Sequence, residues 1–263
     1  MDQPPTAETP TPSAPTAPTM SLAARLFNVV AVPGEVFEQV KNTRSSPANW
    51  IVPILLASVV GAVASFILFS QPAIVQQIRE QQSRAFEERV KAGKMSQADA
   101  DRALAAAERF SGPGLMKLFG AVGSIFYSVG RVFLWGTALW LLGRLFLRAR
   151  FGYMKAVEAA GLATVIAILG TIVTLLLQVI FSSLTISPSL ALLLRDFDPN
   201  KTSHQLLAAV NVFSLWQLGV MASALARLAG SKFTRAGFLL VTVWLIWTLG
   251  LIGLGVLLKR LFG

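Results

Sequence analysis

The chain has 263 residues, of which 54% are hydrophobic and only 14% are charged, and its mean hydropathy is +0.62. Because soluble domains carry about 25% charged residues, this composition excludes an ordinary soluble domain and indicates an integral membrane protein. The net charge of +10 lies largely in short basic segments between apolar runs, which is typical of loops beside a membrane and does not predict a nucleic-acid partner.

The first 44 residues contain no segment long enough to span a membrane. Residues 1–19 hold six prolines and no basic residue, so we expect a disordered tail; a proline-rich ligand for a partner domain is the alternative. Residues 21–44 predict two short amphipathic helices, with Pro33 in the first turn of the second. We expect them to lie in the membrane interface beside the first span, and packing against the ends of the spans is the alternative.

The first predicted span is 50–70, which matches the roughly 20 residues needed to cross a hydrocarbon core. Small residues recur in it at four-residue intervals, at Ala57, Gly61 and Ser65, and predict a face where another helix approaches closely. The following segment, 72–112, mixes basic and acidic residues with alanine and glutamine, and we expect a soluble helical hairpin.

Within this hairpin, three local signals place the helices. Pro72 suits a helix start, Glu80 and Arg84 form a favourable pair four residues apart, and Ser96 with Asp99 predicts a capping box that opens the second helix.

Four further apolar runs complete a predicted bundle of five transmembrane helices, an all-α fold. We expect these spans at about 122–146, 156–182, 206–226 and 236–258. A second stripe of small residues, which includes Ala163, runs along the third span and predicts another close helix contact.

Three stretches of the sequence resemble the Yip (Ypt/Rab-interacting protein) family, in its bacterial branch. They are ARLFNVVAVPGEVFEQVKNTRSSPANW before the first span, FGYMKAVEAAGLATV at the start of the third, and NVFSLWQLGVMASALARLAGSKFTRA across the fourth. The resemblance covers residues 20–262, to which we assign a five-span membrane domain. It implies a cytoplasmic N-terminus, an external C-terminus and a role in membrane organisation or trafficking through protein partners.

The total number of basic residues on each side does not decide the orientation, but the short basic loops agree with it. The loops 144–155 and 227–235 carry basic residues and no acid, so we expect them on the cytoplasmic side of the membrane. The membrane that we expect is the inner membrane of a bacterial cell. Segment 72–112 and the C-terminus then lie outside.

No catalytic motif occurs in the chain, and we expect no enzyme activity. The sequence has no H-E-x-x-H, no G-x-S-x-G and no P-loop. It has no cysteine and a single histidine, His204, so we expect no metal site, and no cofactor is predicted. Glu158 is the one acid that touches a span, near a cytoplasmic end.

A cluster of polar residues inside the predicted spans is the candidate site. Asn211, Ser214 and Gln217 recur every three residues and would share one helix face, to which Gln178 could donate a hydrogen bond. Arg131 is the one charge in the apolar run 118–143, and either reaches the headgroups or faces the bundle, with Gln217, Gln178, Asp196 and Asp198 as candidate partners. Such residues form either a polar path or hydrogen bonds between helices.

Two functions fit these observations. The first is a non-catalytic membrane scaffold that contacts the lipid bilayer and binds a protein partner or forms a homo-oligomer. The second is a small transporter or channel component with a polar path between spans. Five spans do not divide into equal halves, and no internal repeat is evident, which disfavours the second function within one chain.

Overall fold

The computed structural model describes residues 20–110 and 112–262, and the expected tail at 1–19 lies outside them. Over this part the chain is all-α, as predicted, and its only strand-like feature is an isolated bridge between Ser189 and Asn211. Within the described residues, five helices are long and apolar enough to cross a membrane: α3 (Ala48–Leu68), α6 (Pro113–Phe146), α7 (Tyr153–Ile180), α9 (Val212–Ala229) and α10 (Phe233–Leu258 of Phe233–Phe262).

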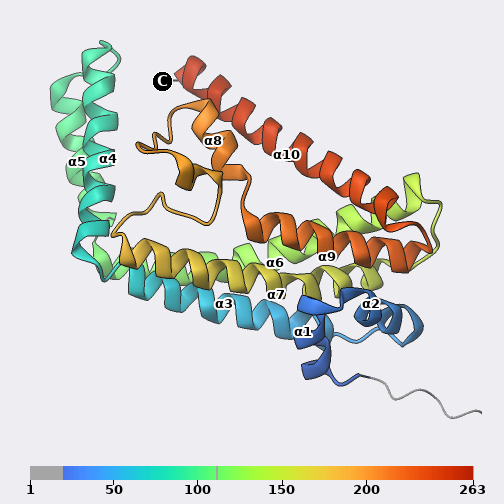
Figure 1. Cartoon of the computed structure of the whole chain (residues 1–263). Helices are drawn as coiled ribbons and strands as arrows, with labels where there is room; N and C mark the ends of the chain where they lie inside the picture. The colour runs from blue at the N-terminus through green and yellow to red at the C-terminus, as the bar shows by residue number, and fades with distance from the viewer. Residues whose placement is uncertain (1–19, 111, 263) are drawn as a thin grey trace, which may run out of the picture.

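Three of these helices, α3, α6 and α7, pack against one another along their length, and α9 lies on α7 (Figure 1). α10 packs mainly on α9, and only its first part is buried, at Ala236 and Leu240. It then diverges from the bundle, and the space beside it holds the segment with a 3-10 turn at Leu190–Leu193 and α8 (Thr202–Ala209) (Figure 1).

Close contacts between helices depend on small residues, as the stripe at Ala57, Gly61 and Ser65 predicts. A Cβ on Gly61 would lie 2.6 Å from Ser124 Cβ on α6, and one on Gly120 would lie 2.5 Å from Ser65 Oγ. Ala163, from the second predicted stripe, is fully buried. The prediction of close helix approach on these faces is therefore confirmed.

The two short helices α1 (Leu22–Ala31) and α2 (Pro33–Asn42) pack against the ends of α7 and α9. Val29 on α1 and Phe37 on α2 are fully buried within the main hydrophobic core. The expected placement in the membrane interface is therefore wrong for these buried faces. They pack against the ends of the spans, which is the alternative prediction. Both helices bury one apolar stripe against protein, because their neighbours α7 and α9 extend past the start of α3 and offer an apolar surface.

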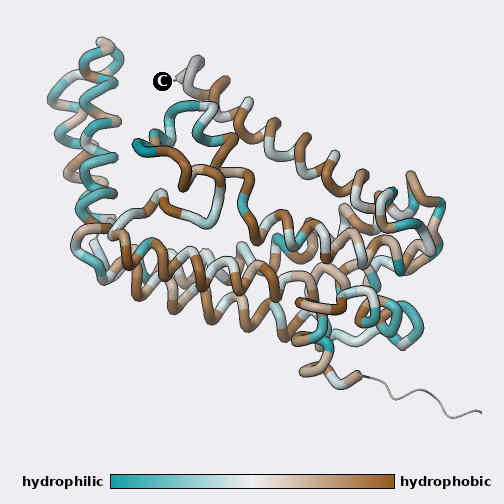
Figure 2. The backbone as a smooth tube through the Cα atoms, viewed as in Figure 1, coloured by the Kyte–Doolittle hydropathy of each residue, from teal (hydrophilic) through white to brown (hydrophobic). Residues whose placement is uncertain are grey.

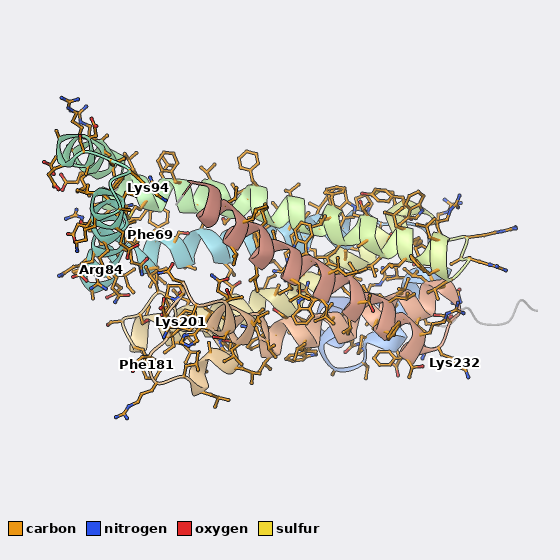
Figure 3. All side chains as sticks on the ribbon, turned by 90° about the horizontal axis from the view of Figure 1, so that it is seen from above. Phe69, Arg84, Lys94, Phe181, Lys201 and Lys232 are labelled. Atoms are coloured by element: carbon orange, nitrogen blue, oxygen red, sulfur yellow. The ribbon has the colours of Figure 1, made fainter. Side chains whose placement is uncertain are left out.

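The hairpin of α4 (Pro72–Lys91) and α5 (Gln97–Phe110) lies at the opposite end of the bundle (Figure 1), and hydrophilic residues predominate in it (Figure 2). The predicted local signals are confirmed: Pro72 occupies the first turn, Arg84 pairs with Glu80 at 3.9 Å, and Ser96 Oγ accepts from Asp99 N at 3.2 Å. Seen from above, Lys232 lies far from Arg84 and Lys94, so the molecule has two well-separated polar ends (Figure 3).

Candidate functional site

A cavity of about 400 Å³ lies between α3, α6, α7 and α9, and we call it the polar cavity. Its walls combine apolar side chains with hydroxyl, amide and guanidinium groups. All five residues of the predicted polar cluster line it, namely Arg131, Gln178, Asn211, Ser214 and Gln217. The structure thus brings the candidate residues to one place, from three different helices and one helix cap.

Arg131 faces the bundle. Its side chain extends from the middle of α6 toward α9. One of its terminal nitrogens donates a hydrogen bond to Gln217 Oε1, and its guanidinium carbon lies 5.8 Å from the centre of the Tyr127 ring. The expectation of a buried partner is confirmed for Gln217.

The other expected partners of Arg131 do not pair with it. Among the residues that the structure describes, Asp196 and Asp198 form no ion pair with Arg131. Gln178 donates from Nε2 to Leu184 O at 2.9 Å, where it holds the turn after α7, and does not reach the α9 face. The expected hydrogen bond from Gln178 to that face is therefore wrong, because the chain folds back at 181–184 and offers a nearer acceptor.

Asn211 caps the N-terminus of α9, a role that its three-residue spacing from Ser214 and Gln217 does not predict. Its Oδ1 accepts from Phe213 N at 2.9 Å and from Ser214 N at 3.4 Å, so it is the N-cap of α9. Asparagine is among the preferred N-cap residues because it satisfies these otherwise unpaired N–H groups. The helix begins at Val212, later than the expected span start at 206, and residues 202–209 form the separate helix α8.

Gln217 is the most buried member of the cluster. Its side chain is only 3% exposed, one turn inside α9, and its carbonyl oxygen accepts from Arg131 across the helix interface. Ser214 lies one turn closer to the cap and also lines the cavity. Because Gln217 and Arg131 meet within the span, the pair fixes how α6 and α9 face each other.

A second polar network lies at the end of the bundle that carries α1 and α2, and sequence reasoning did not assemble it. Glu158 on α7 is fully buried, and its Oε2 accepts from Asn49 Nδ2 on α3 at 2.7 Å. Asn49 Oδ1 in turn accepts from Arg25 NH1 on α1 at 3.3 Å. Asn49 and Arg25 are themselves 1% and 8% exposed, so the chain of contacts is shielded from solvent.

Lys155 completes this network. Its ammonium lies 3.6 Å from Glu158 Oε1 and donates to Val40 O at 2.5 Å and Thr43 O at 2.6 Å. These carbonyls belong to the last turn and C-cap of α2, where a positive charge is stabilised by the helix dipole. A buried acid paired with a lysine thus joins the two short helices to α3 and α7.

The sequence does contain a signal for this network. Lys155 and Glu158 are three residues apart at the start of an alanine-rich apolar helix, where a charge is costly unless it is paired. Their partners Asn49 and Arg25 lie more than a hundred residues away in sequence, and no local pattern connects them. Among the described residues, no group of three or more histidine, aspartate or glutamate side chains could hold a metal ion.

Comparison with known proteins bears on the fold as a whole. Neither the curated proteins nor the solved structures include a match to this chain. The family model of the Yip1 domain matches residues 27–257, a range that runs from α1 to the far part of α10 and includes the polar cavity and, apart from Arg25, the network around Glu158. This match covers most of the chain, so the protein is an integral membrane protein that belongs to the Yip1 domain family.

Proposed function

We propose that the protein is a non-catalytic membrane scaffold that binds a protein partner at the end formed by α1, α2 and the α9–α10 turn. The observation that carries this proposal is the buried network of Arg25, Asn49, Lys155 and Glu158. It holds α1 and α2 in one position on the bundle. A preformed surface loses less entropy on binding than a mobile one, so such an end suits a docking role.

The surface of this end has the chemistry of a protein interface. A groove of about 410 Å³ lies between α2 and the α9–α10 turn and is lined by Glu38, Lys41, Arg227 and Phe233, among others. Arg227 NH1 lies 3.8 Å from Glu38 Oε2 across the groove, and both side chains remain about half exposed. Phe233 is 55% exposed. Arginine and exposed aromatic residues are enriched where proteins bind each other.

We further propose that this end faces the cytoplasm of a bacterial cell. The loops at 147–152 and 230–232 and the adjacent helix ends are basic and without acid, which favours the cytoplasmic side. The hairpin α4–α5 and the far end of α10 then lie on the other side of the membrane. This orientation would place the groove within reach of cytoplasmic partners.

Site-specific photo-crosslinking in native membranes tests the scaffold. A photoreactive residue in place of Asn42, which donates to Glu38 at the groove, should give one protein adduct of defined mass. The matched control is the same group in place of the exposed Glu87 on α4. The adduct should disappear in an Arg227→Glu background. Adducts of equal yield at both positions, or insensitivity to Arg227→Glu, would contradict a specific partner at the groove.

The polar cavity supports a second candidate, a transporter or channel component. It places a cation and several uncharged polar side chains between the spans, as a polar path requires. Purified protein in liposomes would then pass a small solute, and an Arg131→Gln variant would change the flux. The adduct at Asn42 with no measurable flux favours the scaffold over this candidate.

A further inference from the structure

A second cavity adjoins the polar cavity on the side of α10. It measures about 680 Å³ and is lined mainly by Trp135, Met221, Trp244, Trp247 and Leu251, and we call it the aromatic cavity. The two cavities share four lining residues: Tyr127, Arg131, Ser214 and Gln217. The hydrogen-bonded pair of Arg131 and Gln217 therefore separates a polar space from an apolar one.

The shared wall has a positive charge that the protein does not neutralise. In the part of the chain that the structure describes, Arg131 forms no ion pair, and its contacts are Gln217 Oε1 and the Tyr127 ring. A guanidinium has five N–H donors, so most of them face the cavities without a protein acceptor in contact. An anion at this point would accept hydrogen bonds from these donors and balance the charge.

The aromatic cavity opens toward the lipid-facing exterior. Three of its lining side chains, Leu134, Trp247 and Leu251, are at least half exposed, and they lie on α6 and α10. α10 packs on α9 and α8, and only 6% of its most apolar window is buried. A hydrocarbon chain can therefore enter this cavity sideways from the bilayer, and the flat apolar faces of tryptophan and the flexible Met221 suit it.

We propose that these two cavities bind one glycerophospholipid. Its phosphate lies against Arg131, its headgroup hydroxyls contact Gln217, Ser214 and the other polar groups of the polar cavity, and one acyl chain fills the aromatic cavity. Arginine binds phosphate through paired donors. A lipid with net negative charge is preferred, because the described residues that line both cavities include no carboxylate for an ammonium headgroup. This site lies in the membrane and is separate from the docking end proposed above.

Thermal unfolding of the purified, delipidated full chain in detergent tests the proposal. Saturating dioleoyl phosphatidylglycerol should raise the melting temperature by about 5–10 °C, as expected for a ligand that binds only the folded state. Inorganic phosphate and oleate, added separately, should each raise it by less than about 2 °C. Native mass spectrometry should show one retained phosphatidylglycerol per chain.

Three variants distinguish the site from general lipid effects. Arg131→Gln retains a donor for Gln217 and removes the positive charge. Trp247→Ala removes an indole ring from the lining of the aromatic cavity. Both variants should lose most of the lipid-induced shift in melting temperature. Phe238→Ala is the control, because Phe238 is 72% exposed on the same helix and lines neither cavity. Each shift is measured against the same variant without lipid, so lower intrinsic stability does not affect the comparison.

Other outcomes would overturn the proposal. An equal shift with inorganic phosphate would show a small-anion site, and an equal shift with oleate alone would show a carboxylate or chain site. A full phosphatidylglycerol shift in Arg131→Gln would show that the phosphate does not bind at this residue. Equal loss in Phe238→Ala and Trp247→Ala would show a general effect of the bilayer-facing surface.

Discussion

Asn49 at the start of α3 donates a hydrogen bond of 2.7 Å to the fully buried carboxylate of Glu158 on α7. The same carboxylate is neutralised by Lys155, which also binds two carbonyls of α2. This acid and its lysine thus connect α7 to α2 and α3, which lie about a hundred residues earlier in the chain. An unpaired buried charge is far more costly than the loss of both partners. A single variant of this pair should therefore be less stable than the double variant.

Lys155→Met should destabilise the protein strongly, by about 3–5 kcal/mol, because it leaves the Glu158 charge without its counter-ion. Adding Glu158→Gln should recover part of that loss, since the amide carries no charge and still accepts from Asn49. Thermal unfolding in detergent measures both variants. The hypothesis fails if the double variant is as unstable as the sum of the two single variants, because that would mean that the two side chains do not interact.

The Arg131–Gln217 pair should behave as a coupled unit. Arg131→Leu leaves the buried Gln217 carbonyl without a donor and should lower stability by about 1–3 kcal/mol. Arg131→Lys should be intermediate, because lysine lacks the forked donor geometry. In Arg131→Leu/Gln217→Leu the unpaired group is gone, and most of the loss should be recovered. A leucine variant as stable as the parent would show that the hydrogen bond contributes nothing.

Close helix contacts should tolerate no added atoms. Gly61→Leu and Ala163→Leu place bulk in tight contacts and should each cost about 1–3 kcal/mol, whereas Leu55→Ile on an exposed face should be neutral. Gly161→Ala is a finer test, because its Cβ would lie 2.5 Å from Trp50 Cα on α3, a backbone atom that cannot move alone.

The control for this test is Gly123→Ala, where an added Cβ meets nothing within 4 Å. It should be neutral or stabilising, because alanine is the better helix former. Melting temperatures that fall equally in Gly161→Ala and Gly123→Ala would indicate that helix propensity and not packing determines the effect.

The proposed orientation predicts opposite labelling of two positions. The chain has no native cysteine, so single cysteines report cleanly. Ser96→Cys, before α5, should react with an impermeant thiol reagent in intact cells, and Ser45→Cys, between α2 and α3, should react only after lysis. Both serines are exposed, so burial does not obscure the result. The reverse pattern would invert the orientation.

Much of the fold follows from local pattern. The five apolar runs, the capping box at Ser96 and the small residues of α3 are each recognisable from a window of about twenty residues, and the structure places them as helices and contacts accordingly. The first residue of α9 is harder to predict from the sequence, because 206–211 is as apolar as the helix that follows. Only the cap geometry of Asn211 shows where one helix ends and the next begins.

The sequence predicts which residues line the candidate site, but it does not predict the contacts that each of them makes. Arg131 and Gln217 were identified because polar groups are conspicuous in a span, and they do meet. The sequence predicts the wrong partner for Gln178, since its acceptor, Leu184 O, depends on how an irregular segment turns back. The network around Glu158 is not predictable from any local window, because its contacts join four helices that meet only in the assembled bundle.

The sequence separation of Asn49 and Glu158 has a consequence for biosynthesis. The two residues are 109 positions apart, so at about 5–20 residues per second the ribosome adds Glu158 roughly 5–20 s after Asn49. During that interval α1 and α2 have neither the carboxylate nor the Lys155 ammonium that fixes them, and their buried faces have no surface to cover. The N-terminal helices, although made first, therefore reach their final place only after the third span is inserted, and a nascent chain halted before Glu158 would leave them undocked.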